Sequence, residues 1–228
     1  MDLAHANVII IGLGGLGSPV ALYLASSGIG QLQLVDADTV DLTNLQRQII
    51  HETTQIGRYK VESARTRLQQ LAPQTHITCH PYAPQTVEQL IPLLQTADIV
   101  VDCSDNFPTR FALNTACFRL KKPLISGAAI QWGGQVAVFD PRYPESPCYH
   151  CLYEESPLTE DAPTCSTTGI IAPLVGVIGS FQALAVLNLL NHPHITQHGK
   201  LHVFNAFNSQ WRTLTLSKDP TCCQCQAQ

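Results

Sequence analysis

A glycine-rich segment near the N-terminus has a spacing that suits phosphate binding. Its glycines satisfy the pattern G-x-G-x-x-G with one addition: Gly12, Gly14, Gly15 and Gly17. The segment follows the apolar run Val8–Ile11 and precedes the small-residue stretch Ser18–Ser26, so it lies between a predicted strand and a predicted helix. Glycines let backbone N–H groups approach phosphates, and a helix N-terminus favours negative charge. The pattern predicts a nucleotide site, with a ligand-free strand–helix turn as the alternative.

Charged residues farther along the chain could complete such a site. Asp36 ends the predicted strand Gln31–Val35, where a carboxylate can accept hydrogen bonds from ribose hydroxyls. Arg47 and Lys60 follow, and cationic side chains offset the charge of a nucleoside triphosphate. Read alone, Arg47 and Lys60 have an ordinary solvated surface as their less favoured alternative.

A second polar cluster, Asp102-Cys-Ser-Asp105-Asn106, lies at the end of the apolar run Ile99–Asp102. Open α/β sheets bind their ligands at the carboxyl ends of the strands. An aspartate there can hold Mg²⁺ beside phosphates. The alternative is a turn or a cap before the predicted helix Phe107–Leu120.

The chain has nine cysteines, an odd number that argues against a disulfide framework. Two C-x-x-C pairs stand out: Cys148 with Cys151, and Cys222 with Cys225. Two such pairs can furnish a tetrahedral Cys₄ zinc site. Free thiols or a redox pair are the alternative.

Cys165 lies apart from these pairs in a polar segment, so its thiol is predicted to be exposed. It could be a nucleophile with a lowered pKa or an inert loop cysteine.

Charge and hydropathy narrow the class of protein. The formal net charge is −4, which predicts neither a nucleic-acid nor an anionic-membrane partner. The N-terminal residues show no basic leader, which predicts a cytoplasmic protein. Residues Ile170 to Leu190 are long and apolar enough to cross a bilayer, but Pro173 and several polar residues interrupt them. We expect a helix buried in a core or a subunit interface.

Strands and helices alternate through the first half of the sequence, which predicts a mostly parallel sheet with helices on both faces. The predicted helices are Ser18–Ser26, Lys60–Leu71, Val87–Leu94 and Phe107–Leu120. The predicted strands are Val8–Ile11, Gln31–Val35, His76–His80, Ile99–Asp102 and Leu124–Ser126. The second half is expected to add the strands Gln135–Phe139, Leu201–Phe204 and Trp211–Leu216, with a long loop from Asp140 to about Gly169.

Taken together, the sequence resembles the ThiF/MoeB/HesA family, relatives of the ubiquitin-activating enzymes. The resemblance runs from about residue 7 to 225. The motifs that carry it are GLGGLGS (12–18), the strand-end Asp36, NLQRQ (44–48), KVESA (60–64), DCSDN (102–106), CYHC (148–151), TCSTTGIIAPLVGVIGS (164–180) and the terminal C-x-x-C. It implies a Rossmann-like α/β fold with a C-terminal β extension and a zinc-tied tail. It also implies one adenylation domain over residues 1–228, with a nucleotide-binding half (1–127) and a carrier-binding, zinc and dimer half (128–228).

The resemblance further implies roles for individual residues. ATP is expected at the four glycines, at Asp36 through its ribose, and through its phosphates at Asn44, Arg47, Gln48 and Lys60. Asp105, with Asn106 beside it, is expected to handle Mg²⁺, and the four cysteines of the C-x-x-C pairs to bind structural Zn²⁺. In ThiF-like members the cysteine matching Cys165 becomes linked to the carrier, whereas in MoeB-like members it is not needed for adenylation.

The activity that the resemblance implies is ATP-dependent adenylation of the C-terminal glycine of a ubiquitin-like sulfur carrier protein ending in Gly-Gly, by a homodimer that releases pyrophosphate. An α-carboxyl group has a pKa of about 3.3–3.7, so this nucleophile is already ionised at neutral pH. Arg47, Lys60 and an Asp105-bound magnesium ion would relieve the repulsion between carboxylate and polyphosphate. The segment FNAFNSQWRTLTL (204–216) favours ThiF of thiamine biosynthesis over MoeB of molybdopterin biosynthesis, and sulfur is expected from a separate protein.

One departure from the family and two other functions stay open. Family members carry an N-terminal Arg that reaches the partner subunit's ATP, whereas the first Arg here is Arg47. A truncated start, a substitute residue or weak activity would each account for this. A nicotinamide-dependent oxidoreductase is a second reading, which NLQRQ and the paired C-x-x-C motifs oppose. A non-catalytic nucleotide-binding relative is the third.

Overall fold

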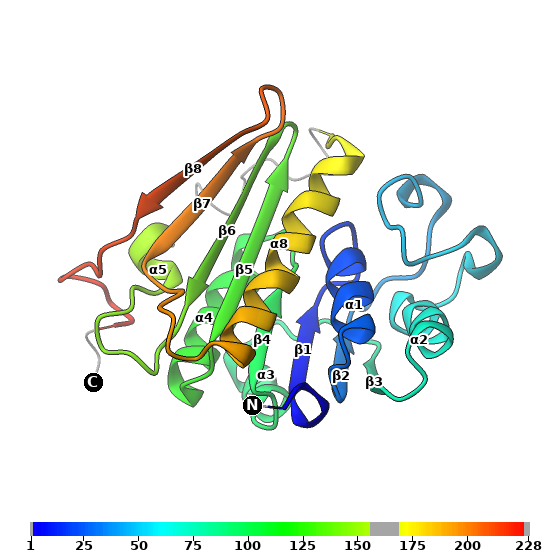
Figure 1. The fold of residues 1–228 in the computed structure, drawn as a ribbon, viewed down its shortest axis with the longest axis horizontal. Coiled ribbons are helices and arrows are strands. Elements are labelled where there is room, and N and C mark those ends of the chain that lie inside the picture. Colours follow the sequence, from blue (N-terminus) through cyan, green and yellow to red (C-terminus); the bar gives the residue numbers. More distant parts are fainter. Residues whose placement is uncertain (1, 156–168, 226–228) are drawn as a thin grey trace.

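The computed structural model describes residues 2–155 and 169–225. Cys165 lies outside these residues. The described residues form an α/β fold built on one mixed sheet with helices on both faces (Figure 1).

Eight strands form the sheet in the order β3-β2-β1-β4-β5-β6-β7-β8. The first five are parallel: β3 (His76–His80), β2 (Gln31–Val35), β1 (Asn7–Ile11), β4 (Ile99–Asp102) and β5 (Leu124–Ile130). An antiparallel extension follows: β6 (Gly133–Phe139), β7 (Lys200–Asn205) and β8 (Gln210–Thr215). The predicted parallel sheet and C-terminal β extension are therefore confirmed.

The central strands are continuously apolar because helices cover both of their faces. The helices on one face are α1 (Gly17–Ser26), α2 (Lys60–Leu71) and α8 (Ala172–Asn191); those on the other are α3 (Val87–Leu94), α4 (Phe107–Leu120) and the short α5 (Tyr149–Leu152). Successive residues of β1 divide between the two cores. Val8 and Ile10 pack toward α1 and α8, and Ile9 and Ile11 toward α3 and α4.

The long apolar helix α8 packs on the sheet and against α1 (Figure 1). It is the one helix among the described residues that is long and apolar enough to cross a membrane, and 56% of its most apolar window is buried. Its fully buried Gln182 donates a hydrogen bond from Nε2 to the carbonyl of Asp102 at the end of β4 (2.7 Å). The predicted buried helix is confirmed, and Gln182 links it to the carboxyl end of β4, where ligands are expected.

Two parts of the fold are more regular than the sequence suggests. β5 and β6 extend beyond the predicted Leu124–Ser126 and Gln135–Phe139 and meet in a hairpin at Ile130 and Gly133. Their added residues are mostly small and carry little strand propensity of their own, so pairing across the hairpin decides their conformation. The predicted long loop after Asp140 contains α5, whose first residue follows Cys148.

Candidate functional site

A cavity of about 590 Å³ opens at the carboxyl ends of β1, β2 and β4, a size typical of small-molecule sites. Most of the predicted nucleotide-site residues line it: Gly12, Gly14, Gly15, Asp36, Arg47, Gln48, Lys60, Asp105 and Asn106. Gly17 and Asn44 do not. The fold thus brings together segments that are far apart in the sequence, in a crevice at the carboxyl ends of the strands, where open α/β sheets bind their ligands.

The positions of the loop require glycine for different structural reasons. Gly12 has φ +94°, and a Cβ there would lie 2.7 Å from the carbonyl oxygen of Cys103. A Cβ on Gly17 would lie 1.9 Å from the carbonyl oxygen of Gly12. Gly17 therefore serves the close packing of α1 on the loop, whereas Gly14 and Gly15 line the cavity itself.

Asp36 stands at the end of β2 and binds the glycine loop directly. Its Oδ2 accepts from the N–H of Leu13 (2.7 Å) and its Oδ1 from the N–H of Asp38 (2.8 Å). Burial raises the pKa of Asp36, and the nearby charge of Lys60 opposes this effect. Each carboxylate oxygen keeps a further lone pair, so acceptance of ribose hydroxyls is compatible with these contacts.

Lys60 and Arg47 line the cavity, and each interacts with a neighbouring side chain. Lys60 is only 5% exposed, and its Nζ lies 2.7 Å from Oδ2 of Asp38. Arg47 donates from a guanidinium nitrogen to Oδ1 of Asn44 (2.7 Å). Asn44 thus orients Arg47 and does not itself line the cavity. Its contact with a phosphate stays a prediction.

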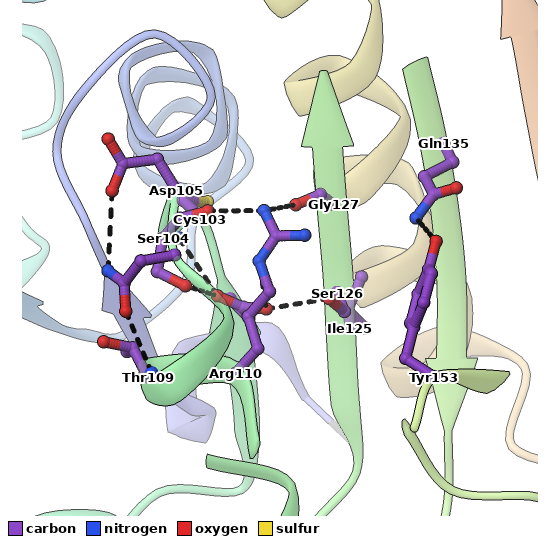
Figure 2. A network of polar contacts seen from close by, with 12 residues as sticks. Cys103, Ser104, Asp105, Thr109, Arg110, Ile125, Ser126, Gly127, Gln135 and Tyr153 are labelled. Carbon is purple, nitrogen blue, oxygen red and sulfur yellow. Dashed lines mark hydrogen bonds and ion pairs between the residues drawn. The ribbon is translucent and has the colours of Figure 1, made fainter. Parts of the chain in front are cut away.

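The DCSDN segment combines a buried anchor with an exposed carboxylate (Figure 2). Fully buried Asp102 accepts hydrogen bonds from the hydroxyls of Ser104 (2.6 Å) and Ser126 (2.7 Å). Asn106 caps α4, since its Oδ1 accepts from the N–H of Thr109 (2.9 Å), and its amide lies 3.5 Å from Asp105. Asn106 therefore has the capping role that the sequence left open, while it also lines the cavity.

Asp105 has the environment that a magnesium ligand requires. Its carboxylate is exposed at the cavity, and within the described ranges no cationic side chain forms an ion pair with it. Mg²⁺ is usually held by one or two carboxylates together with substrate phosphates. The donor set at this position therefore fits a phosphate-bound magnesium ion.

Arg110, on the first turns of α4, is a site residue that the sequence did not single out. Its guanidinium donates to the carbonyl oxygens of Ser104 (2.7 Å) and Gly127 (3.2 Å), and its Nε lies 3.9 Å from Oδ2 of Asp102 (Figure 2). Arg110 lines the cavity although it is only 8% exposed. It thereby fastens the DCSDN segment to β5.

A second missed residue, His51, supports the glycine loop from behind. Its Nε2 lies 3.0 Å from the carbonyl oxygen of Leu13, and its Nδ1 3.0 Å from Oγ of Ser63 on α2. Burial lowers the pKa of His51 from 6.5 to about 4, so the ring is neutral at pH 7. His51 belongs to no motif or periodic pattern, so the sequence alone does not indicate its role.

The far end of the cavity follows β5 and β6. Small residues line it there, namely Ala128, Gly133 and Gly134. At its border Gln135 donates a hydrogen bond to the hydroxyl of Tyr153 (Figure 2). The ring of Tyr153 packs edge-on against Phe107. The cavity therefore continues past the nucleotide-binding residues into an extension lined mostly by small and apolar residues of β5 and β6.

The four cysteines of the C-x-x-C pairs lie together, away from the cavity. Their sulfur atoms are all within 4.8 Å of one another, and adjacent pairs are separated by 3.9 Å (Cys148–Cys151), 3.7 Å (Cys148–Cys222) and 3.6 Å (Cys151–Cys225). A tetrahedral zinc site with Zn–S bonds of about 2.3 Å has S···S edges of roughly 3.8 Å. The cluster therefore fits zinc. Cys223 is exposed outside it, and His150 bonds to Asn114 instead (2.8 Å).

Comparison with known proteins places these features in one family. The model of the ThiF family matches residues 1–225. The chain is 44% identical over 224 residues to the molybdopterin-synthase adenylyltransferase of Salmonella typhimurium, covering 98% of this chain and 88% of that protein. It is 43% identical over 223 residues to the sulfur carrier protein ThiS adenylyltransferase of Escherichia coli, covering 98% and 87%.

Two further matches differ in length or are more distant. The chain is 42% identical to the adenylyltransferase and sulfurtransferase MOCS3 of Anopheles gambiae, with 99% of this chain matched, but it spans only 51% of that protein's length. Among solved structures, Escherichia coli MccB with ATP superposes with a TM-score of 0.85 at 22% identity, covering 98% of this chain and 68% of MccB. At that identity the likeness supports the fold alone.

Proposed function

Because this chain belongs to the ThiF family, and its relatives are adenylyltransferases, we propose that it adenylates the C-terminal glycine carboxylate of a ubiquitin-like sulfur carrier protein. The observation that carries the proposal is one cavity whose lining includes the glycine loop, the cations Arg47 and Lys60, and the exposed carboxylate of Asp105. A polyphosphate with its magnesium ion needs each of these groups. The apolar extension along β5 and β6 would receive the carrier's C-terminal tail.

In the proposed reaction a carboxylate oxygen of the carrier bonds to the α-phosphorus of ATP, and the bond from that phosphorus to the bridging oxygen of pyrophosphate breaks. The nucleophile is ionised at neutral pH, so no general base is required. The main barrier is the approach of one anion to another. Lys60 and Arg47 would lower it by placing fixed positive charge beside the phosphates in a cavity that restricts water.

Other residues of this chain would orient the nucleotide. Asp36 would accept the ribose hydroxyls, and Gly14 and Gly15 would offer backbone N–H groups to the phosphates. Mg²⁺, when bound at Asp105, would neutralise phosphate charge. Zn²⁺, when bound by the four cysteines, would tie the C-terminal tail to the segment before α5 without an open coordination position.

We propose a ThiS-type carrier of thiamine thiazole biosynthesis as the substrate, and a molybdopterin-synthase small subunit as the alternative. The segment 204–216 supports the ThiS-type carrier. The chain is 43% identical to the ThiS adenylyltransferase and 44% identical to the molybdopterin-synthase adenylyltransferase, so the identities do not separate the two carriers. Cys165 would form a covalent link with the carrier in the first case only. Sulfur would come from a separate protein.

We further propose that residues 1–127 bind nucleotide and that residues 128–228 bind carrier, zinc and a second copy of the chain in a cytoplasmic homodimer. Support for the dimer comes from α8, where the apolar Val177 and Leu184 are 38% and 51% exposed and lie two helical turns apart on one face. Burial of the rest of α8 against the sheet supports a chain that acts in solution.

Intact-mass spectrometry tests the proposal directly. The chain is incubated with Mg–ATP and either the ThiS-like or the MoaD-like carrier of the source organism. We expect a carrier species heavier by one AMP, with the modification on the terminal glycine, and we expect more of it with the ThiS-like carrier. Formation of the adenylate with the MoaD-like carrier alone would select the alternative, and its absence with both carriers would reject adenylation.

A further inference from the structure

The backbone of Leu13, inside the glycine loop, is held from two sides. Its N–H donates to Oδ2 of Asp36 (2.7 Å), and its carbonyl oxygen lies 3.0 Å from Nε2 of His51. His51 is in turn held by Ser63, at 3.0 Å from Nδ1. Leu13, His51 and Ser63 are all at least nine-tenths buried, so these contacts are shielded from water.

Planarity of the peptide bond transmits this anchoring to the next residue. In a trans peptide the carbonyl of Leu13 and the N–H of Gly14 point in opposite directions. Gly14 lines the cavity and His51 does not. A carbonyl that is directed at His51 therefore turns the N–H of Gly14 away from His51, toward the cavity. In the part of the chain that the structure describes, no protein acceptor takes the N–H of Gly14 or Gly15.

Glycine at position 14 makes such an anchor necessary. A peptide flip changes ψ of Leu13 and φ of Gly14, and glycine tolerates either sign of φ. The flipped peptide would direct the carbonyl of Leu13, a partial negative charge, into the cavity where phosphates are expected. Within residues 2–155 and 169–225, the contact with His51 is the one that opposes this rotation from the carbonyl side.

The state of the His51 ring is defined by its two partners. Donation to a carbonyl requires the hydrogen on Nε2, so Nδ1 accepts from the hydroxyl of Ser63. Burial and the charge of Lys60 both disfavour the imidazolium, which keeps the pKa near 4 and the ring neutral at pH 7. Ser63 therefore selects the tautomer that holds Leu13.

We propose that His51 and Ser63 are positioning residues for nucleotide binding, which lock the Leu13–Gly14 peptide so that the Gly14 N–H faces the phosphates. The inference rests on the proposed ATP-dependent function. It assigns a role to two residues that do not line the cavity.

The test compares His51→Gln with His51→Asn. The Nε2 of glutamine can occupy the place of the histidine Nε2, whereas asparagine is too short to reach the Leu13 carbonyl. We expect His51→Asn to raise the KM for ATP roughly 10-fold or more in pyrophosphate exchange, because a buried carbonyl loses its donor. The KM for the carrier should change less than about 2-fold. His51→Gln should stay within about 3-fold of wild type in both constants.

Ser63→Ala provides a milder variant that should fold even if His51→Asn does not. We expect it to raise the KM for ATP by about 3- to 10-fold, since the ring then loses its fixed tautomer. Equal defects in His51→Gln and His51→Asn, equal rises in both KM values, or a wild-type ATP KM in folded Ser63→Ala would each overturn the inference.

Calorimetric titration with Mg–ATP alone separates this inference from the proposed function. Wild-type protein that binds Mg–ATP but exchanges pyrophosphate with neither carrier would reject the function, while the binding affinities of the variants would still decide the role of His51. Folded wild-type protein that does not bind Mg–ATP would overturn both.

Discussion

Single residues set the charge balance of the cavity. Its lining includes the carboxylates Asp36, Asp38 and Asp105, and the cations Arg47, Lys60 and Arg110. Arg110 is engaged by backbone carbonyls and Asp102, so Arg47 and Lys60 are the two cations that a polyphosphate would meet. Their charges should therefore contribute more to turnover than to folding.

The first prediction concerns these two cations. Arg47→Ala or Lys60→Ala should lower the rate of carrier-dependent pyrophosphate exchange at least about 100-fold, because fixed charge beside the reacting phosphates is lost. Circular dichroism should show a folded protein in both cases. Arg58→Ala serves as the control, since the exposed Arg58 donates to Gln55 and lies outside the cavity lining. Near wild-type exchange in either cavity variant would contradict the assignment.

A second prediction follows from the ion pair between Lys60 and Asp38. Asp38 is 71% exposed at its side chain, so water screens the carboxylate that faces the buried Lys60. Asp38→Asn would leave the Lys60 charge free for phosphates, so Mg–ATP should bind up to about 5-fold more tightly at low salt. Asp41→Asn, in the same loop, should bind as wild type does. Weaker binding by Asp38→Asn would show that Asp38 instead positions Lys60 for the nucleotide.

The third prediction is a pH dependence of stability due to His51. The pKa of His51 is about 4 in the folded protein and 6.5 in the unfolded chain. Between these two pH values the unfolded chain therefore binds more protons than the folded protein. Stability should therefore fall as the pH drops from 6.5 to about 4, by at most about 3 kcal/mol from this residue. Urea unfolding should show this loss in wild type and a smaller one in His51→Gln. His80 and His202, whose pKa values burial also lowers, contribute equally to both proteins.

Site residues that belong to motifs were predictable from the sequence, whereas those that act through buried contacts were not. Gly14, Arg47, Lys60 and Asp105 have types and spacings that suggest phosphate and metal chemistry. The role of His51 depends on a carbonyl 38 residues away in the sequence. No local pattern records such a contact.

Among the elements, α4 links the cavity to the cysteine cluster. Its N-terminal turns carry Asn106 and Arg110 at the cavity, while Asn114 farther along accepts from the N–H of Tyr149 (2.8 Å), next to Cys148. Thr115 donates to Gln224, between the two C-terminal cysteines of the cluster (3.0 Å). The tail and α5 are therefore fastened to the same helix that positions the DCSDN segment.

The fourth prediction tests the cysteine cluster. Cys222→Ser should reduce bound zinc well below one ion per chain and lower the Tm, because metal-binding free energy stabilises the fold. A loss of about 3 kcal/mol would correspond to roughly 6–12 °C in a chain of this size. Cys223→Ser, which changes an exposed cysteine outside the cluster, should retain both zinc and Tm. Equal zinc content in the two variants, measured by atomic emission, would contradict the site.

Elements with strong hydrophobic patterns were predictable almost to the residue. The apolar run of β4 and the periodic α2 are examples, because burial on both faces or on one face dictates their composition. The extension of β5 through Gly127 and Ala128 was not predictable, since these residues are small for reasons of packing. A Cβ on Gly127 would collide with the side chain of Gln182 from α8.

At the scale of the whole molecule, the parallel half of the sheet holds the nucleotide-site residues and the antiparallel half extends the cavity. Helix α8 lies over the sheet where these two halves meet, and its outward face exposes apolar side chains. A single copy of the chain would leave this face in water, which supports the proposed homodimer.

The fifth prediction concerns this face of α8. Leu184→Asp should convert the dimer to a monomer in sedimentation-velocity measurements, because a buried unpaired carboxylate is costly at an interface. Leu71→Asp, at a similarly exposed leucine on α2, should leave the dimer intact. Wild-type protein that sediments as a monomer at micromolar concentration would reject the proposed dimer.

Carrier-dependent ATP–pyrophosphate exchange would report the attack of the carrier carboxylate on ATP itself. We expect exchange that requires Mg²⁺ and a carrier ending in Gly-Gly, and that disappears when the carrier's C-terminal carboxylate is amidated. The amidated carrier is the matched control, since it differs only in the proposed nucleophile. No exchange with either carrier of the source organism, or equal exchange with the amidated one, would contradict the account.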